Sequence, residues 1–455
     1  MKIKLAEEVK HLTSEQLEEL YERYISGEKN QELMEEFGID AHPNKLVSLF
    51  PPVMHESFEC AYCSLPLFYK RKSKTGASYS MEYFCLECDH KEGHHYNRPL
   101  VCKCSPCSEK RAEAARAKLA ADLEKISQEY DLEKKVMLKY SDLSFRHKCY
   151  LLSLFLMQSD SDLNRIKPLN NSGSAVELSP SDNFDNEIII KLHRDGAIAV
   201  DARSPLSAFD PSDDFKSFSY RDVFWVVNVS LDGSRRLSLE ELFKLVYVEL
   251  RDGIQLEWEE ELKELVFKLA EEEVAKYLSI CLEQLQLPDA PKKTNEVIKE
   301  ILNEFSVSEI YYFIKKATEN AHIFYAKGKA ESRKHAVNTI PSKVLYLATR
   351  ASNEGWDVYK YNRIYGTERS QLNIVLFDLV IGGGDDIAFY KSPEALWSND
   401  LHKVFDDSKP SEEAVSNTSC IGCGSTDVTI KTDKNTLTLL CAQCGEQQQF
   451  YASKN

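Results

Sequence analysis

Several features that mark common protein classes are missing from this sequence of 455 residues. It has no apolar run long enough to span a bilayer and no early segment of signal-peptide form, so we expect a cytoplasmic protein with no membrane partner. It has no excess of positive charge, because its formal net charge is −16, and this excludes uniform wrapping of the chain in nucleic acid. The Walker A loop, the dinucleotide fingerprint, the nucleophile elbow and the HExxH motif are lacking as well, so the reactions tied to those motifs are not indicated.

Isolated cysteines are also scarce, because only Cys149 and Cys281 of the thirteen stand apart from the rest. The other eleven lie in two short segments near the two ends of the chain. In a reducing compartment, cysteine pairs at this spacing hold metal rather than form disulfides. Four thiolates, or three thiolates and one imidazole, complete a tetrahedral zinc ion, so we expect two to three Zn²⁺ ions per chain.

The N-terminal cysteine group has enough ligands for two zinc ions. Its candidate ligands are Cys60, Cys63, Cys85, Cys88, His90, His95, Cys102, Cys104 and Cys107, and His94 is a third histidine that could serve. The simplest pairing places the two CxxC pairs on one ion, and the last three cysteines with one histidine on the other. A cross-braced pairing of the same residues stays open.

The C-terminal cysteine group has the clearer pattern. Two CxxC pairs, each followed by a glycine, are separated by seventeen residues that include a predicted strand at 436–440. The four candidate ligands are Cys420, Cys423, Cys441 and Cys444. This pattern resembles the zinc ribbon that is common in transcription and RNA-processing proteins. Because all four ligands are cysteine, the site is expected to be structural, with no coordination position left for water.

Positive charge is concentrated in two stretches. Residues 51–120 carry 11 Lys or Arg and 8 Asp or Glu, and residues 311–370 carry 11 and 5, with aromatic residues in between. The predicted hairpin of the first zinc site carries a run of four cations beside Tyr69, namely Lys70, Arg71, Lys72 and Lys74. A basic tip beside an aromatic ring suits a phosphate backbone, although most such tips are simply solvated.

The first 52 residues predict three short helices. Thr13 and Gln16 form a capping box for the first helix, and the third is expected over residues 43–50. The order resembles the helix-turn-helix of many small bacterial DNA-binding proteins. That resemblance implies a recognition helix in the third position, with Asn44 and Lys45 at the end that faces the groove. A small helical bundle packed on the zinc module explains the pattern equally well.

The whole chain predicts a mainly helical α+β protein of several domains. Residues 142–230 show a helix, a second helix, a tight turn and a short strand, which resembles a winged helix. The predicted parts are a helix-turn-helix-like unit at 1–52, a zinc-ribbon module at 53–107, a connecting helix at 108–141, the winged-helix-like unit at 142–230, a helical domain at 238–400, a linker at 401–419 and a C-terminal zinc ribbon at 420–455.

Two patterns could indicate catalysis. The N-terminal cluster loosely resembles the zinc-bound core of HNH nucleases, but Ser108 and Lys110 stand where that family supplies a metal-binding side chain. The Gly-Asp-Asp segment with Asp385 and Asp386 resembles the Mg²⁺-binding hairpin of palm-domain polymerases. A helix that is capped by Ser370 and stopped by the glycines is the better interpretation of that segment.

These features together favour a zinc-binding protein that binds nucleic acid, DNA more than RNA, in a prokaryotic cytosol. Regulation or defence against mobile elements would suit such a protein. The main alternative is a scaffold whose zinc modules and acidic helices bind other proteins. A metal-dependent nuclease or nucleotidyl enzyme is the second alternative, but no catalytic residue is assigned and the sequence favours a role without catalysis.

Overall fold

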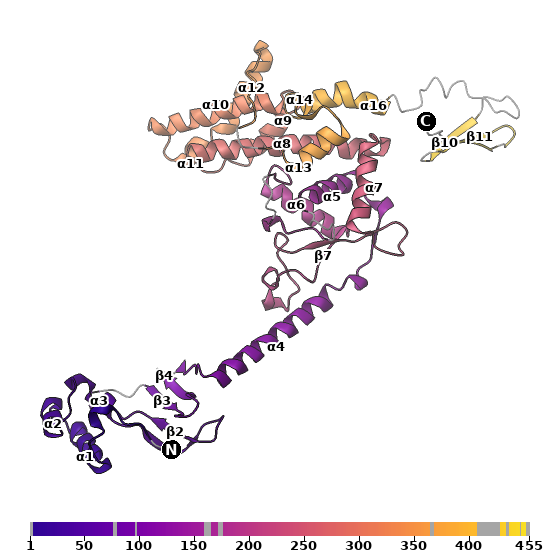
Figure 1. Cartoon of the computed structure of the whole chain (residues 1–455). Helices are drawn as coiled ribbons and strands as arrows, with labels where there is room; N and C mark the ends of the chain where they lie inside the picture. Colours follow the sequence, from indigo (N-terminus) through magenta and orange to yellow (C-terminus); the bar gives the residue numbers. More distant parts are fainter. Residues whose placement is uncertain are drawn as a thin grey trace. The chain divides into compact units, whose positions relative to one another are not determined.

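The computed structural model describes residues 3–75, 80–95, 98–158, 165–171, 176–364, 368–406, 428–433, 436–445 and 447–451. The chain divides into two compact units, Met1–Lys125 and Ile126–Asn455. Helices dominate and the sheets are small, which confirms the expected mainly helical α+β class (Figure 1). Among the described residues, every helix is either too short or too polar to cross a lipid bilayer. The finer division into seven parts stays a prediction.

The first unit begins with a small helical bundle. Its elements are η1 (Glu7–Val9), α1 (Ser14–Ile25), α2 (Asn30–Glu36), η2 (Pro43–Lys45) and α3 (Leu46–Leu49). The predicted capping box of Thr13 and Gln16 starts α1, and a core that includes Leu20, Leu33 and Leu46 holds the helices together. The third helix expected over residues 43–50 is present as a 3₁₀ turn followed by one α-helical turn, and its role as a recognition helix stays a prediction.

A five-stranded antiparallel sheet follows in the same unit. Its strands lie in sequence order as β1 (Val53–Glu59), β2 (Pro66–Tyr69), β3 (Ser80–Phe84), β4 (Lys91–His95) and β5 (Arg98–Pro99). Gly93 is required where β4 passes β3, because its φ is +124° and a Cβ there would lie 1.8 Å from the Met81 carbonyl oxygen. The long helix α4 (Ser105–Glu129) comes next. The connecting helix therefore ends earlier than the predicted residue 141, because Asp131 caps a 3₁₀ turn and the chain then enters a strand.

The second unit starts with a mixed layer of short strands and two helices. Its elements are η3 (Leu132–Lys134), β6 (Leu138–Lys139), η4 (Tyr140–Asp142), α5 (Phe145–Gln158), η5 (Leu169–Asn171), α6 (Asp182–Arg194), β7 (Ile198–Val200), η6 (Leu206–Ala208), η7 (Pro211–Asp213), β8 (Trp225–Val227) and β9 (Val229–Ser230). β7 pairs antiparallel with β8, and β6 pairs parallel with β9. The order of α5, α6 and β7 is the one predicted, and the likeness to a winged helix stays a prediction.

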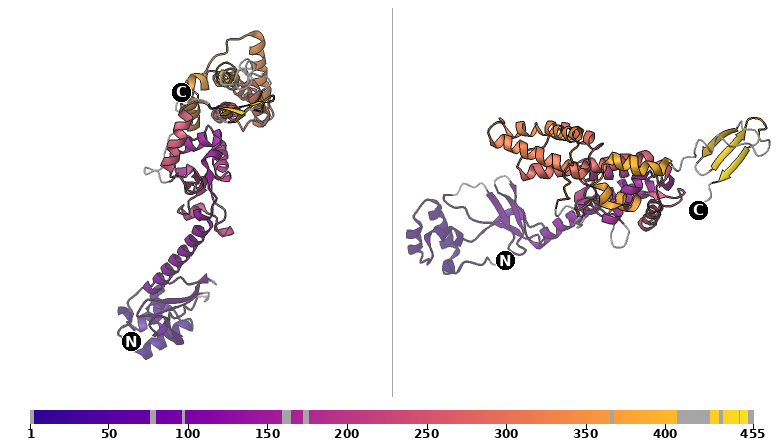
Figure 2. Two further views of the ribbon diagram at one scale, coloured as in Figure 1. Left: turned by 90° about the vertical axis from the view of Figure 1, so that its right-hand side faces the viewer. Right: turned by 90° about the horizontal axis from the view of Figure 1, so that it is seen from above.

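Helices follow in the second unit. They are α7 (Leu239–Arg251), η8 (Leu256–Trp258), α8 (Glu259–Gln284), α9 (Lys293–Ile301), α10 (Val307–Ala326), α11 (Arg333–Val337), α12 (Ile340–Glu354), α13 (Gln371–Ile374), η9 (Val375–Val380), α14 (Gly384–Ala388), α15 (Pro393–Leu396), η10 (Trp397–Leu401) and α16 (His402–Asp406). α10 packs against α8, α11 and α12, and Figure 2 shows these helices from two further directions. The last residue of η10 and the whole of α16 occupy residues that the sequence predicted as the start of a linker.

The described C-terminal residues form a three-stranded antiparallel sheet of β10 (Val428–Asp433), β11 (Thr436–Cys441) and β12 (Gln447–Tyr451). β11 confirms the strand predicted between the two cysteine pairs. Cys441 ends β11, and Cys444 lies in the turn that follows. Cys420 and Cys423 lie outside the described residues, so the C-terminal zinc ribbon stays a prediction.

Candidate metal centres and neighbouring surfaces

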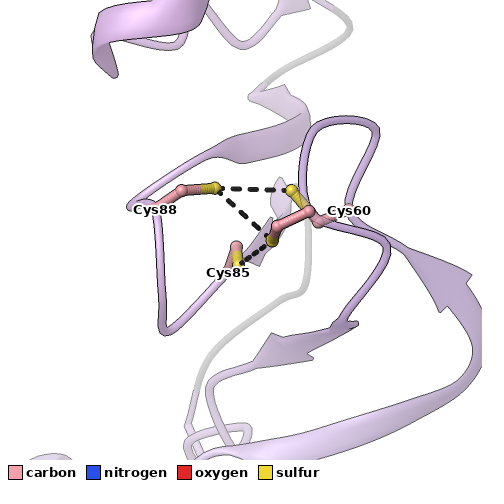
Figure 3. Close-up of side chains that lie close together, drawn as sticks. Cys60, Cys85 and Cys88 are labelled. Carbon is pink, nitrogen blue, oxygen red and sulfur yellow. Dashed lines mark hydrogen bonds between the residues drawn. The ribbon is translucent and has the colours of Figure 1, made fainter.

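Four cysteines of the first unit converge on one point. The Sγ atoms of Cys60, Cys63, Cys85 and Cys88 all lie within 4.8 Å of one another. The Cys60–Cys88 and Cys63–Cys85 sulfur distances are 3.4 and 3.3 Å, and the Cys63–Cys88 distance is 3.9 Å (Figure 3). Sulfurs at the corners of a tetrahedron around zinc should lie about 3.8 Å apart, given a Zn–S bond of about 2.3 Å. The group therefore fits one tetrahedral metal ion.

Each CxxC pair in this cluster forms a tight turn. The residue that follows the second cysteine of each pair has a positive φ, in the left-handed region. Ser64 follows Cys63 with φ of +55°, and Asp89 follows Cys88 with φ of +54°. Gly445 holds the same place after the second C-terminal pair, with φ of +75°. The turn lets backbone N–H groups face sulfur, as in the Glu87 amide bond to Cys85 Sγ at 3.4 Å. Non-glycine residues at this position indicate that the turn is held by its surroundings.

A second group of four ligands lies at the start of α4. It contains His90, Cys102, Cys104 and Cys107, again with all ligand atoms within 4.8 Å. His90 Nδ1 lies 3.6 Å from Cys104 Sγ and 3.4 Å from Cys107 Sγ, close to the roughly 3.6 Å expected across a zinc ion for one nitrogen and one sulfur. Cys107 lies in the first turn of α4.

The structure thus brings the ligands together in the simplest predicted pairing and selects His90 as the histidine. His95, the other histidine proposed as a ligand, is corrected: it lies exposed in β4 opposite Arg98, outside both clusters. His94 is also exposed in β4, opposite Pro99. His90 differs because Asp89 turns the chain before β4 begins, so its imidazole enters the buried end of the sheet.

Further side chains support the second centre. His90 Nε2 donates to Glu92 Oε1 at 2.8 Å, which leaves the lone pair of Nδ1 available to coordinate a metal. Carboxylates in this position fix the tautomer and ring orientation of metal-binding histidines. Tyr62, which lies between two ligands of the first centre, contacts Cys107 Sγ through its hydroxyl at 3.2 Å. Its ring also meets the His90 ring edge-on at 4.9 Å. Tyr62 therefore links the two centres.

The thiols differ in how readily they ionise. Burial opposes ionisation of Cys102, but the N–H groups of Cys104 and Lys91 outweigh it and lower the pKa of the thiol to about 6. Burial also opposes ionisation of Cys60, and the N–H groups of Tyr62 and Cys63 bring its pKa to about 7. Each centre therefore contains one thiol that is prepared to act as a thiolate ligand.

The four cations of the predicted basic hairpin tip form two pairs, and one pair contacts the helical bundle. Arg71 forms a two-pronged ion pair with Glu18 and lies over the Tyr21 ring at 4.4 Å. Lys74 donates to the Glu28 carbonyl oxygen and lies over the Tyr24 ring at 5.0 Å. The hairpin is thus docked on the helical bundle.

Two of the four cations in the tip point away from these contacts. The side chains of Lys70 and Lys72 are exposed, whereas those of Arg71 and Lys74 are half-buried against α1. Asn44 and Lys45 are exposed as well, but they lie in a 3₁₀ turn that is too short to fill a DNA groove as a recognition helix does.

The sequence did not reveal an aromatic cluster on the sheet. The rings of His55 and Phe58 stack at 4.0 Å with an interplanar angle of 8°. Tyr83 meets both edge-on at 5.2 and 5.0 Å, and Tyr69 lies 6.3 Å from Tyr83. Phe58 is 45% exposed. His55 and Phe58 stand three residues apart in β1, so regular strand alternation would place them on opposite faces; the irregular register between Met54 and Glu59 brings them together, and no local pattern predicts it.

The Gly-Asp-Asp segment is a helix start, which corrects the palm-like alternative. Ser370 caps α13, as the preferred interpretation predicted, and the glycines precede α14. Asp385 is held by the guanidinium of Arg363 at 2.8 Å, and Arg363 also pairs with buried Glu273. Arg369 approaches Asp385 at 3.3 Å. A carboxylate shared between two arginines is not placed to bind Mg²⁺.

Several glutamates of the acidic helix α8 form ion pairs with lysines and arginines of the second unit. Glu261 pairs with Arg146, and Glu273 pairs with Arg363. Glu271 approaches Lys299 at 3.4 Å, and Glu272 contacts Lys268 at 2.8 Å. These pairs join α8 to α5 and α9 and leave less acidic surface than the sequence suggested.

Comparisons with protein-family models, with curated proteins and with solved structures gave no match to this chain.

Proposed function

We propose that this protein is a zinc-stabilised nucleic-acid-binding protein, with DNA preferred over RNA, and that the sheet of its first unit makes the contact. Zinc is the metal that takes both four-thiolate and three-thiolate-plus-imidazole ligand sets in closed structural sites. With all four positions filled by the protein, neither centre has room for a metal-bound water. The zinc ions would hold the strands and loops of the module in place, and the surface would do the binding.

The observation that carries this proposal is the aromatic cluster of His55, Phe58, Tyr69 and Tyr83 beside the exposed Lys70 and Lys72. Nucleobases stack on aromatic side chains, each with about 1–3 kcal/mol of binding free energy. Lysines next to such rings attract the phosphate backbone. Regulation of transcription or defence against mobile elements in a prokaryotic cytosol would suit such an activity.

Binding to labelled single-stranded DNA, double-stranded DNA and RNA by fluorescence anisotropy at low salt tests the proposal. Phe58→Ala should weaken binding about tenfold because a stacking surface is removed, and the double change Lys70→Gln/Lys72→Gln should reduce its salt dependence. The matched control is Arg116→Gln/Lys118→Gln on the exposed face of α4, which should leave affinity within about twofold of the wild type, as expected for residues outside the interface. Absence of binding to all three probes by the wild-type chain would refute the proposal.

A second candidate function is that of a scaffold for a protein partner. An open hollow of about 500 Å³ lies beside the second centre, lined in part by Tyr62, Leu100, Val101 and Arg111. Val101 is 67% exposed, and exposed apolar side chains at a rigid hollow suit a protein partner. Val101→Asp should abolish capture of such a partner without changing nucleic-acid affinity. If instead Val101→Asp weakens only nucleic-acid binding, the scaffold function is excluded.

A further inference from the structure

The turn between α10 and α11 holds a concentrated group of cations that the site described above does not use. Lys327, Lys329, Arg333 and Lys334 lie within eight residues, and Glu331 is the one acidic residue among them. All four cationic side chains belong to exposed residues. Within the part of the chain that the structure describes, no ion pair with a carboxylate neutralises any of the four, whereas Lys315 and Lys316 on the preceding helix, α10, both approach Glu319.

The backbone under these cations is firmly held. Gly328 turns the chain with φ of +65°, and Ser332 caps α11 by accepting the His335 N–H at 3.1 Å. Ala330 and Ala336 are buried in the core formed with α8, α9, α10 and α12. The turn therefore presents its charges from a fixed position rather than from a loose loop.

Neighbouring groups hold Arg333 in place and put an aromatic ring beside it. The Arg333 guanidinium lies 5.6 Å from the centre of the Tyr325 ring and donates to the Gln286 carbonyl oxygen at 3.0 Å. That bond ties α11 to the loop between α8 and α9, which ends at the exposed Lys292 and Lys293. Tyr325 is 37% exposed.

We infer that the α10–α11 turn is a second contact for the phosphate backbone of nucleic acid, separate from the zinc module, and this inference rests on the proposed function. The cations spread along an exposed turn instead of converging on a cavity, which suits a row of phosphates better than one small anion. Protein interfaces are depleted in lysine, so the composition of the turn disfavours a protein partner. The contact is electrostatic and reads no sequence.

The test uses the full chain with Lys327→Gln/Lys329→Gln/Lys334→Gln, leaving Arg333 in place because it ties α11 to its neighbour. Anisotropy is measured with a labelled DNA of random sequence over a series of salt concentrations. The triple variant should bind about tenfold more weakly at low salt, and the slope of log affinity against log salt should fall by roughly 0.9 for each phosphate that the variant no longer neutralises. The control Lys315→Gln/Lys316→Gln removes two cations of α10 that both approach Glu319, and it should keep most of the wild-type slope.

The outcomes separate this inference from the proposed function. An unchanged slope in the triple variant, with weakened binding in Phe58→Ala, overturns the inference and keeps the proposed function. A reduced slope in the triple variant with unchanged binding in Phe58→Ala supports the turn and removes the zinc module as the contact. Equal losses in the triple variant and in the control would show a general charge effect and overturn the inference.

Discussion

Among single residues, the second candidate metal centre is supported by side chains outside its four candidate ligands. Glu92 orients His90 through a 2.8 Å hydrogen bond, and Tyr62 reaches from the first CxxC turn to Cys107. Outer partners of this kind matter nearly as much as ligands, because they fix the direction and basicity of the ligand atoms. Tyr62 is therefore expected to support the second centre from the first CxxC turn.

Tyr62→Phe tests that link. Removal of the hydroxyl that contacts Cys107 should weaken metal binding at the second centre about 10- to 100-fold and leave the first centre unchanged. Competition with a zinc chelator, followed by the absorption of Co²⁺ bound in place of zinc, measures both centres. Glu56→Gln, on the exposed part of β1, is the control. Equal weakening at both centres would contradict a local role for the hydroxyl.

The second unit should lose stability as pH falls, because His147 is buried and His193 is half-buried. Burial lowers the pKa of His147, which Asp195 only partly offsets, and burial likewise lowers the pKa of His193. Both histidines are then neutral in the folded protein, while the unfolded chain binds protons near pH 6.5. The stability that they contribute is therefore fully present above about pH 6.5 and is lost as pH falls below it.

Urea unfolding followed by tryptophan fluorescence measures this effect, since all four tryptophans lie in the second unit. Between about pH 6.5 and 5, His147→Gln should reduce the pH dependence of the unfolding free energy by up to about 1.4 kcal/mol per pH unit. His322→Gln, on the exposed face of α10, should leave that dependence as in the wild type. An unchanged slope in His147→Gln would show that this histidine is not the sensitive group.

Among secondary-structure elements, the docking of the β2–β3 connection on α1 makes the helical bundle and the zinc module one unit. Arg71 carries much of this contact through Glu18 and Tyr21. Arg71→Ala should destabilise the docked helix by about 1–2 kcal/mol, because the ion pair and the ring contact are removed together. Lys70→Ala, one residue earlier and exposed, should cost under about 0.5 kcal/mol. Hydrogen exchange of the α1 amides measures both, and equal protection in the two variants would contradict the docking role.

The start of α14 offers a second pair of matched changes. Asp385 is held by Arg363, whose side chain is 13% exposed, so Asp385→Asn should destabilise the second unit by about 1–3 kcal/mol. Asp386 is exposed, and Asp386→Asn should change stability by less than about 0.5 kcal/mol. Tryptophan-detected unfolding with and without Mg²⁺ measures both variants. Stabilisation of the wild type by Mg²⁺ that Asp386→Asn abolishes would restore the metal-binding alternative.

Structure that depends on neighbouring residues could be predicted from the sequence, whereas contacts between distant segments could not. The CxxC pairs and the capping boxes at Thr13, Ser238 and Ser306 are local patterns, so their structures follow from neighbouring residues. The choice of His90 among three histidines depends on the turn at Asp89. The role of Arg71 depends on a helix about fifty residues earlier in the chain, which no local pattern encodes.

In the molecule as a whole, the net charge of −16 is unevenly distributed, because residues 51–120 and 311–370 each carry more Lys and Arg than Asp and Glu. The acids of α8 face lysines and arginines of the same unit. Two local surfaces are proposed to bind nucleic acid. One is formed by Lys70 and Lys72 beside the aromatic cluster of the first unit, and the other is the α10–α11 turn of the second unit. We therefore expect nucleic-acid affinity to rise as the salt concentration falls, and to decrease when either surface is changed.

Both the fold of the first unit and its proposed binding surface depend on the two metal centres, so the decisive measurement is the metal content of the purified full chain. Elemental analysis should find two to three zinc ions per chain, and Cys63→Ser/Cys88→Ser should lower that value by one. Co²⁺ in place of zinc should give the intense absorption of tetrahedral thiolate sites. A zinc content below one per chain would contradict both centres.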